Sequence, residues 1–210
     1  MRNLLFLLLS ATFYGCALPE GWEKIDAEGL PENTMFSNVV FADDSVGYAA
    51  TVIPKMSVHK TTNGGKNWTK IPLNGQDASV RQMYAFKGSL VVLVQTFREL
   101  SDYILRYDNG SWDTIYQSKD GFDIHNMYFE EPAKGFAVLG KSSSSQKPVL
   151  ISLKGKAIDT LNEIQYEYRN SYFTKDTVYS FQQHTPSNSY IATSLVTGNQ
   201  YLHKFEKRLL

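Results

Sequence analysis

Residues 38–68 read NVVFADDSVGYAATVIPKMSVHKTTNGGKNW, and this stretch decides the fold. Two short apolar runs, Asn38–Phe41 and Gly47–Ala50, flank an acidic turn at Asp43 and Asp44, which is the pattern of a β-hairpin. The same pattern recurs three more times along the chain. Its anchoring aromatic residues lie about 44 residues apart, and they are Phe41, Tyr84, Phe129 and Phe173.

A second motif repeats with the same stride. Residues 61–68 read TTNGGKNW, and degenerate copies follow at Asp108–Trp112 and Ser194–Tyr201. A large residue near the end of each unit defines a second ladder, namely Trp68, Trp112, Ile158 and Tyr201. A four-stranded unit of about 40 to 50 residues is typical of a propeller blade. The sequence therefore predicts an all-β, β-propeller-like domain of about four to five four-stranded blades of ~44 residues each, in a small or incomplete ring.

The chain divides into three parts. Residues 1–15 indicate an export leader, residues 16–34 a lipidated N-terminus with an extra strand at Gly21–Ile25, and residues 35–210 the repeat domain. Its units are expected at about 35–74, 75–118, 119–163 and 164–210. In propellers an N-terminal strand often completes the last blade. If the last unit here has its own fourth strand, the extra strand Gly21–Ile25 cannot take that position. Two alternatives stay open: a closed ring of four or five blades, or an open arc whose unpaired edges need a partner or a dimer.

The N-terminus has the features of a bacterial lipoprotein signal. A short apolar run, Leu4–Leu9, precedes Cys16, the one cysteine of the chain, and is too short to span a bilayer. The run Phe13–Cys16 (FYGC) resembles a lipobox, although its first two residues are bulkier than usual. The resemblance implies lipidation of Cys16 and, because Ala17 follows, an outer-membrane anchor facing the periplasm. The alternative is an ordinary signal peptide cut near Ala17.

The unit from Phe41 to Trp68 resembles a blade of the BNR/Asp-box β-propellers, in particular those related to the photosystem II assembly factor. Their blades read F-x-D…G-(W/Y)-A…T-(D/N)-G-G-K-x-W, and the match is specific only in this first unit. The resemblance implies that Thr61, Asn63, Gly65 and Trp68 form a structural turn. In such a turn the Asn accepts backbone hydrogen bonds, the Gly supplies a positive φ and the Trp packs on the next strand. The resemblance implies a fold and does not transfer a function.

Composition and motifs exclude several classes of function. The chain has 21 basic and 21 acidic residues without a basic cluster, so nucleic acid is not an expected partner. The lone cysteine and four dispersed histidines give no metal-ligand spacing, and we expect no metal and no cofactor. The motifs G-x-S-x-G and H-E-x-x-H are absent. The sequence therefore predicts a protein that binds rather than an enzyme.

The expected function is that of an envelope lipoprotein that binds another protein and touches the membrane through its lipid alone. One version is an immunity protein that neutralises a periplasmic toxin, such as a type VI secretion lipase effector. The alternatives are an assembly or stability factor for an envelope complex, and a carbohydrate-binding or sialidase-like Asp-box protein. Loops offer aromatic and basic residues for a protein partner, and the candidates are Arg98, Tyr103, Tyr166, Tyr168 and Arg169.

Overall fold

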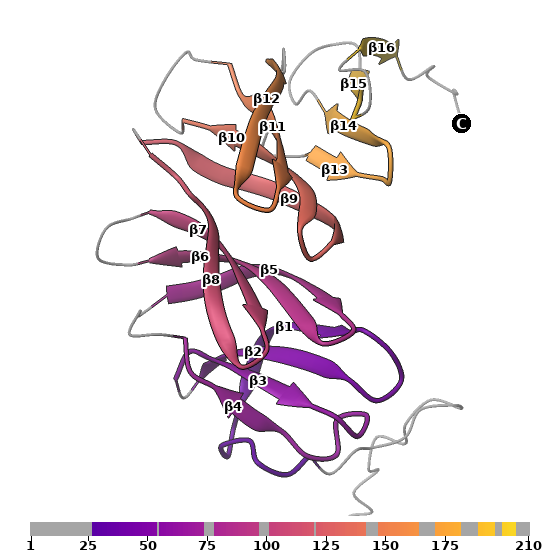
Figure 1. Ribbon diagram of the computed structural model, residues 1–210. Helices are drawn as coiled ribbons and strands as arrows, with labels where there is room; N and C mark the ends of the chain where they lie inside the picture. The colour runs from indigo at the N-terminus through magenta and orange to yellow at the C-terminus, as the bar shows by residue number, and fades with distance from the viewer. Residues whose placement is uncertain are drawn as a thin grey trace, which may run out of the picture.

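The computed structural model describes residues 27–53, 55–73, 78–96, 101–119, 121–141, 147–163, 171–181, 189–195 and 199–204, and in these residues it contains strands and no helix (Figure 1). The first two four-stranded sheets comprise β1 (Met35–Phe41), β2 (Gly47–Ile53), β3 (Ser57–Thr61), β4 (Thr69–Ile71), β5 (Ala78–Phe86), β6 (Ser89–Thr96), β7 (Asp102–Asp108) and β8 (Ser111–Gln117). The other two comprise β9 (Asp123–Glu131), β10 (Lys134–Gly140), β11 (Val149–Lys154), β12 (Ala157–Glu163), β13 (Ser171–Phe173), β14 (Thr177–Phe181), β15 (Ser189–Ser194) and β16 (Gln200–Lys204).

Each sheet is an antiparallel meander in which neighbours in sequence are neighbours in space. The four sheets are β1–β4, β5–β8, β9–β12 and β13–β16, and each lies within one of the four predicted repeat units. Hydrophobic runs of four to nine residues separated by turn residues form such hairpins, because adjacent strands pair as soon as the chain reverses. The predicted all-β fold of four-stranded blades is confirmed.

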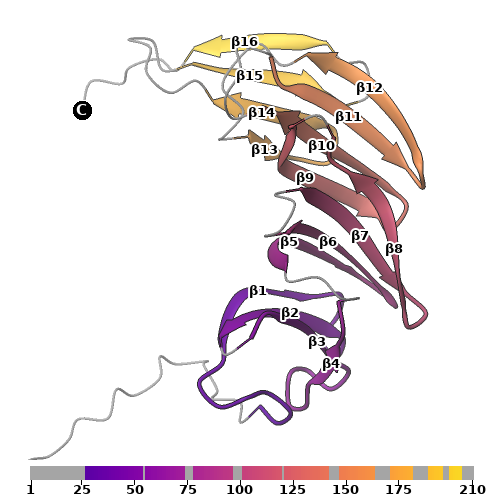
Figure 2. The same ribbon diagram turned by 90° about the vertical axis from the view of Figure 1, so that its left-hand side faces the viewer.

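The sheets follow one another along an arc, and the arc is open between the first and the fourth sheet (Figure 2). Strands β1, β5, β9 and β13 lie on the inner side of the arc, where neighbouring sheets converge, and the sheets diverge towards their outer strands. Of the two arrangements left open by the sequence, the described residues adopt the incomplete ring.

Each sheet has a leading face towards the preceding sheet and a trailing face towards the next one. Side chains alternate between the two faces along each strand. Between the first and second sheets, fully buried Tyr48, Ala50 and Val58 pack against Leu90 and Val92. Two further layers of buried apolar side chains lie between the second and third sheets and between the third and fourth. The core is therefore a series of layers between stacked sheets.

Equivalent phenylalanines are buried inside the arc and exposed at its end, where no described sheet covers them. Phe41, Phe129 and Phe173 all lie on leading faces, opposite the first or second residue of the next strand. Phe129 and Phe173 are buried, with 3% and 8% of their surface exposed, because a preceding sheet covers each of them. Phe41 is 47% exposed, because no described sheet precedes β1.

The assignment of Tyr84 to this ladder is wrong by one residue. Ala85, which pairs with Leu90, occupies the position of Phe41, and the ladder then has a constant step of 44 residues. Tyr84 lies on the trailing face and contacts Phe129 of the third sheet with ring centroids 6.4 Å apart. A slip of one residue along a strand moves a side chain to the opposite face. The aromatic ring of Tyr84 resembles that of Phe41 in the sequence, although the two side chains lie on opposite faces of their sheets.

The last member of the second ladder is also shifted by one residue. Trp112 pairs with Tyr107 and Ile158 with Leu153, and the corresponding pair in the fourth sheet is Gln200 with Thr193. Tyr201 is 57% exposed.

The leader, Cys16 and the predicted strand Gly21–Ile25 lie outside the described residues. Within the described part of the chain, no helix is long and apolar enough to cross a membrane.

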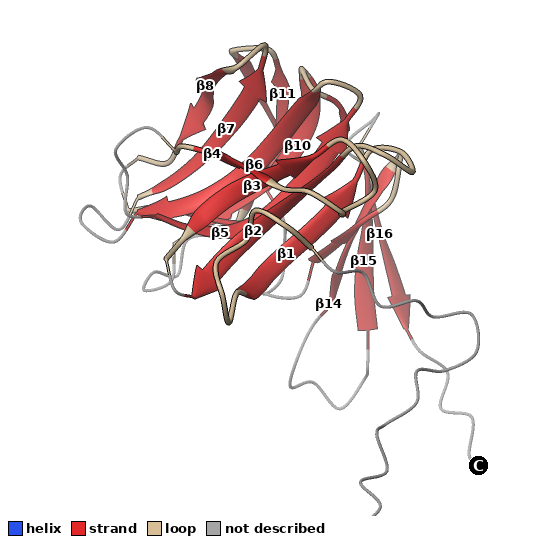
Figure 3. Cartoon of the chain, turned by 90° about the horizontal axis from the view of Figure 1, so that it is seen from below, coloured by secondary structure: helices blue, strands red, loops and turns tan. Residues whose placement is uncertain are grey.

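Residues 27–34, which we call the strap, run beneath the first sheet and onto its leading face (Figures 2 and 3). The backbone N–H of Glu28 donates to the Lys66 carbonyl and the N–H of Trp68 donates to the Glu28 carbonyl, each at 2.8 Å. From Trp68 at the outer edge, the strap leads to Met35 on the innermost strand. It thereby crosses the side of β3 that carries Ser57 and His59.

The side chains of β3 on this leading face are small or polar, and they are Ser57, His59 and Thr61. At the matching positions the second and third sheets carry larger apolar or aromatic side chains, namely Tyr103, Leu105, Tyr107, Val149, Ile151 and Leu153. His59 is 2% exposed, and its Nε2 lies 2.9 Å from the Ser57 hydroxyl, which lies 2.9 Å from that of Thr51. The row is a polar end-cap under the strap, where the other sheets have a hydrophobic layer.

His59 predicts a loss of stability in acid. Its burial, and secondarily the charge of Lys70, lower its pKa from the ordinary value of 6.5. The unfolded chain then binds the proton more readily than the folded chain, so the free energy of unfolding falls as the pH drops below 6.5. In His59→Gln, whose amide can still meet Ser57, this part of the pH dependence is expected to vanish. Urea titrations of both proteins between pH 8 and 5 measure the difference, and parallel curves would contradict the assignment.

Candidate binding surface

The turn after β3 uses its polar groups internally. The Thr61 hydroxyl accepts hydrogen bonds from the N–H groups of Gly65 at 3.0 Å and Asn63 at 3.3 Å. The Asn63 side-chain oxygen accepts from the N–H of Asn67 at 2.9 Å, and the Trp68 indole donates to the Gly65 carbonyl at 2.8 Å. Gly65 has a φ of +90°, which an L side chain rarely adopts. These hydrogen bonds stabilise the turn from within, as the resemblance to an Asp-box implies.

The two rims of the arc differ in how the strands are joined. Because every sheet is a meander, the turns between first and second strands and between third and fourth strands lie on one side, here called the turn rim. Several of these turns have two residues, as at Lys87–Gly88, Asn109–Gly110 and Gly155–Lys156. Asn109 and Gly110 both have positive φ, at 47° and 83°, as a type I′ hairpin requires. The turns of the second and third sheets at this rim are therefore tight, whereas the first sheet has a longer turn at residues 62–68.

The opposite side, here called the loop rim, carries the connections that join second to third strands and one sheet to the next. They span residues 54–56, 72–77, 97–101, 118–122, 141–148, 164–170 and 182–188, and all but the first have five residues or more. Long connections held by a rigid scaffold are where proteins place binding residues. The loop rim is therefore the candidate surface.

A buried carboxylate at the loop rim forms an ion pair within the second sheet and a hydrogen bond to the third. Asp102, at the start of β7, has no exposed surface, and its Oδ2 accepts hydrogen bonds from the N–H of Ile124 at 2.6 Å and from Arg81 Nη1 at 3.2 Å. Ser118 closes the arrangement, since its hydroxyl accepts from the N–H of Asp102 at 2.9 Å. A buried carboxylate is costly unless it is paired and hydrogen-bonded. Arg81 pairs with this carboxylate within the second sheet, and the Ile124 N–H hydrogen bond connects the second sheet to the third.

Burial raises the pKa of Asp102, while the Ile124 N–H and the charge of Arg81 oppose that shift. The side chain of Arg81 remains 34% exposed, so the ion pair presents a cation at the rim. At the same rim, Lys141 follows β10 of the third sheet, and its Nζ lies 4.6 Å from the centroid of the Phe122 ring. The described part of this rim thus combines cations with a partly buried aromatic ring.

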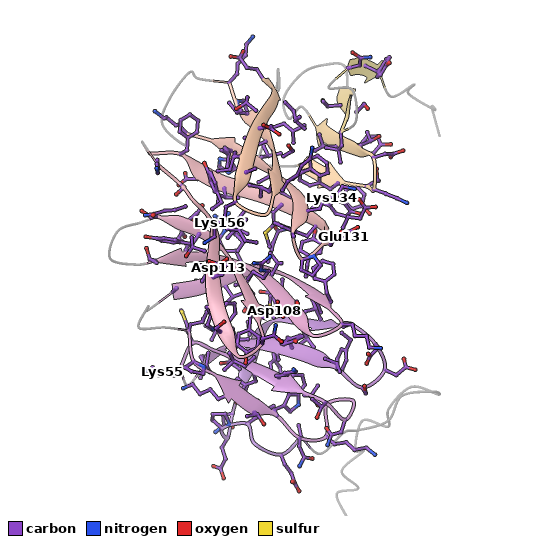
Figure 4. The ribbon with its side chains drawn as sticks, in the orientation of Figure 1. Lys55, Asp108, Asp113, Glu131, Lys134 and Lys156 are labelled. Atoms are coloured by element: carbon purple, nitrogen blue, oxygen red, sulfur yellow. The ribbon has the colours of Figure 1, made fainter. Side chains whose placement is uncertain are left out.

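An ion pair at the surface also spans the second and third sheets. Lys156 Nζ in the β11–β12 turn lies 2.9 Å from Asp113 Oδ1 on β8, and Figure 4 shows both side chains between the second and third sheets. Both side chains are largely exposed, so this ion pair contributes little stability.

The structure places the predicted loop residues unevenly. Tyr103 was predicted to lie in a partner-binding loop, and this prediction is wrong. It is the second residue of β7, it is 8% exposed in the layer against the first sheet, and its hydroxyl accepts from Gln117 at 2.9 Å. The remaining candidates lie outside the described residues, in the connections β6–β7 and β12–β13 that belong to the loop rim, and they are Arg98, Tyr166, Tyr168 and Arg169.

Sequence reasoning missed Arg81 and Asp102. The available signal was an acidic residue directly before the apolar run of β7, at a position where the other sheets have no acid. No motif links two residues 21 positions apart, so their meeting depends on the fold. Within the described residues, no group of three or more His, Cys, Asp or Glu side chains is placed to hold a metal ion.

Comparison with known proteins shows the fold. No protein-family model and no curated protein matches the chain. A solved structure described as YCF48 bound to D1 peptide superposes with a TM-score of 0.58 at 14% identity, over 85% of this chain and 56% of that one. The fold is that of a β-propeller. A putative TolB from Agrobacterium tumefaciens superposes on the propeller with a TM-score of 0.55 at 13% identity, over 86% of this chain and 68% of that one.

Part of a prolyl endopeptidase structure is also similar to the propeller, with a TM-score of 0.59 at 16% identity, over 81% of this chain and 26% of that one. The propeller spans about half the length of the YCF48 chain. At these identities the likeness shows a shared fold and transfers no activity, because one fold carries many functions.

Proposed function

We propose that the chain is a non-enzymatic module that binds another protein through its loop rim. The observation that carries the proposal comes from the second and third sheets, whose turn-rim turns have two residues each while the connections at their loop rim have five to eight. Asp102 lies at this rim, where it pairs with Arg81 and accepts a hydrogen bond from the third sheet. Arginine is among the residues enriched in binding hot spots, and Arg81 is partly exposed at this rim. A propeller solved with a bound peptide, YCF48, is a precedent for peptide recognition on this fold.

The finer proposal concerns the place and the partner. With Cys16 lipidated, the module would stand on the outer membrane and face the periplasm. A partner that is a toxin entering the periplasm, such as a type VI secretion lipase effector, would make the module an immunity protein. A partner that is a multi-subunit envelope complex would make it an assembly factor, which is the role suggested by the resemblance to the photosystem II assembly propellers.

A charge-matched pair of double variants tests the rim. We expect Arg98→Ala with Arg169→Ala, both in connections of the loop rim, to weaken capture of the partner at least about tenfold, since removing a hot-spot side chain costs 1 kcal/mol or more. The control is Lys66→Ala with Lys87→Ala, two exposed cations of the turn rim, which removes the same charge. Capture from envelope extracts, compared quantitatively among the three proteins, gives the ratios. A greater loss in the control would place the site on the other rim.

Co-expression distinguishes the two partners. The product of the gene adjacent to this one is expected to kill cells when it is exported alone, and co-export of the wild-type propeller, but not of the loop-rim variant, restores growth. Co-purification of the propeller with an intact membrane complex, without any toxic neighbour, would favour the assembly factor.

A further inference from the structure

An aromatic pair recurs between neighbouring sheets on the inner side of the arc. Tyr84 on the trailing face of the second sheet contacts Phe129 on the leading face of the third, with ring centroids 6.4 Å apart. Tyr128 of the third sheet stacks on Phe173 of the fourth at 6.1 Å. In both pairs the tyrosine precedes the phenylalanine by 45 residues. The pair is thus part of the repeat.

The two ends of the arc carry the unmatched halves of this pair. Tyr172 follows Tyr128 by 44 residues and occupies the same trailing position, yet it is 63% exposed. Phe41 occupies the leading position of Phe129 and is 47% exposed. A tyrosine without a phenylalanine stands at one end, and a phenylalanine without a tyrosine stands at the other.

Apolar surface surrounds each unmatched residue. Most of the exposed large apolar side chains of the described residues lie on the leading face of the first sheet, and they are Met35, Phe36, Val39, Phe41 and Ile53. On the fourth sheet, Tyr172 pairs with Tyr179, which continues the same row through Ala192 to the exposed Tyr201. Contiguous exposed apolar residues of this kind mark protein interfaces.

We infer that these two surfaces bind each other between two copies of the chain. The trailing face of the fourth sheet in one copy packs on the leading face of the first sheet in the other, so that Tyr172 meets Phe41 as Tyr128 meets Phe173. The contact continues the packing already present within the chain. Two such contacts close a ring of eight sheets from two chains, within the range of four to eight blades that propellers have.

The strap fits this arrangement. Neighbouring sheets converge at their inner strands and diverge outwards (Figure 2). In the first sheet, small polar side chains at Ser57 and Thr61 leave room in the wide outer part, and the strap lies there. The inner part with β1 stays free for Tyr172 and Tyr179. The strap thus fills the space that larger side chains fill between the other sheets.

Molar mass in solution tests the inference. The full chain with Cys16→Ser, which cannot be lipidated, is expected to sediment with the mass of two chains. Phe36→Asp removes an exposed ring that has no aromatic partner among the described residues, and Tyr172→Asp removes the other side of the contact. Each is expected to raise the dissociation constant about thirtyfold or more, as loss of a hot-spot aromatic does. Ile158→Asp, at a 45% exposed position away from both ends, is the matched control and remains dimeric.

Mixing the two variants identifies the geometry. Phe36→Asp retains an intact fourth sheet and Tyr172→Asp an intact first sheet, so an equimolar mixture regains one contact and forms a mixed dimer. A contact between two copies of the same face would not be restored in this way. A single-chain mass at every concentration overturns the inference, as does a dimer unaffected by either variant. Neither result bears on the loop rim, which is tested by the arginine double variant.

Discussion

Gly135→Ala is expected to destabilise the protein by about 3 kcal/mol, at the upper end of what overpacking costs. A Cβ at Gly135 would lie 2.6 Å from the ring of Phe129, closer than real contacts allow. The ring cannot withdraw, because Phe129 is 3% exposed and Tyr84 packs on its other side. Chemical denaturation followed by tryptophan fluorescence measures the loss.

Gly47→Ala is the matched control. Its Cβ would lie 2.5 Å from the ring of Phe41, which is the same local conflict. Phe41 is 47% exposed at the open end of the arc, so its ring can turn away at a cost of about 1 kcal/mol or less. Measured at a concentration where the chain is monomeric, the two losses should differ clearly. Equal losses would show that Phe41 is covered in solution by something other than a second copy.

Gly29→Ala is expected to detach the start of the strap and to cost about 3 kcal/mol. The added Cβ would overlap the carbonyl oxygen of Trp68, and Gly29 has a φ of +80°. Relief of this overlap breaks the two backbone hydrogen bonds between Glu28 and the β3–β4 turn, each worth about 1 kcal/mol, and the strained φ adds about 1 kcal/mol. Hydrogen exchange at the Trp68 amide should accelerate as the strap leaves.

Gly88→Ala separates the effect of φ from that of the overlap. Gly88 has a φ of +87°, yet nothing lies within 4 Å of an added Cβ. Its replacement is expected to cost only the backbone strain, about 1 kcal/mol, and to leave exchange at Trp68 unchanged. If both variants lose the same free energy, the contact between the strap and Trp68 contributes nothing.

Two different surfaces carry the two proposed contacts, the loop rim for a protein partner and the ends of the arc for a second copy of the chain. Positions inside the stack are fixed by the packing of one sheet on the next, whereas the residues at the rim are free of that constraint. The Arg81–Asp102 pair is the exception, because it lies in the stack and reaches the rim. This is why the rim can carry a binding function without disturbing the layers beneath it.

Local patterns were enough to predict the strands and their grouping. The hairpin from Phe41 to Gly47 and the turn from Thr61 to Trp68 are encoded by residues within a few positions of one another, and the 44-residue stride copies them along the chain. The face of the sheet on which each side chain lies was harder to predict. Tyr84 and Tyr103 are aromatic residues in strand sequences, and nothing local distinguishes a side chain that points to one neighbour from one that points to the other or to solvent.

The sequence by itself thus determined a stack of four-stranded sheets, because strand pairing and turn chemistry depend on near neighbours. Only the tertiary structure decided that the arc stays open, that the strap covers a polar row at Ser57 and His59, and that Asp102 meets Arg81. These features depend on contacts between distant residues and on the angle between packed sheets, and a repeating pattern carries no information about where the repeat must stop.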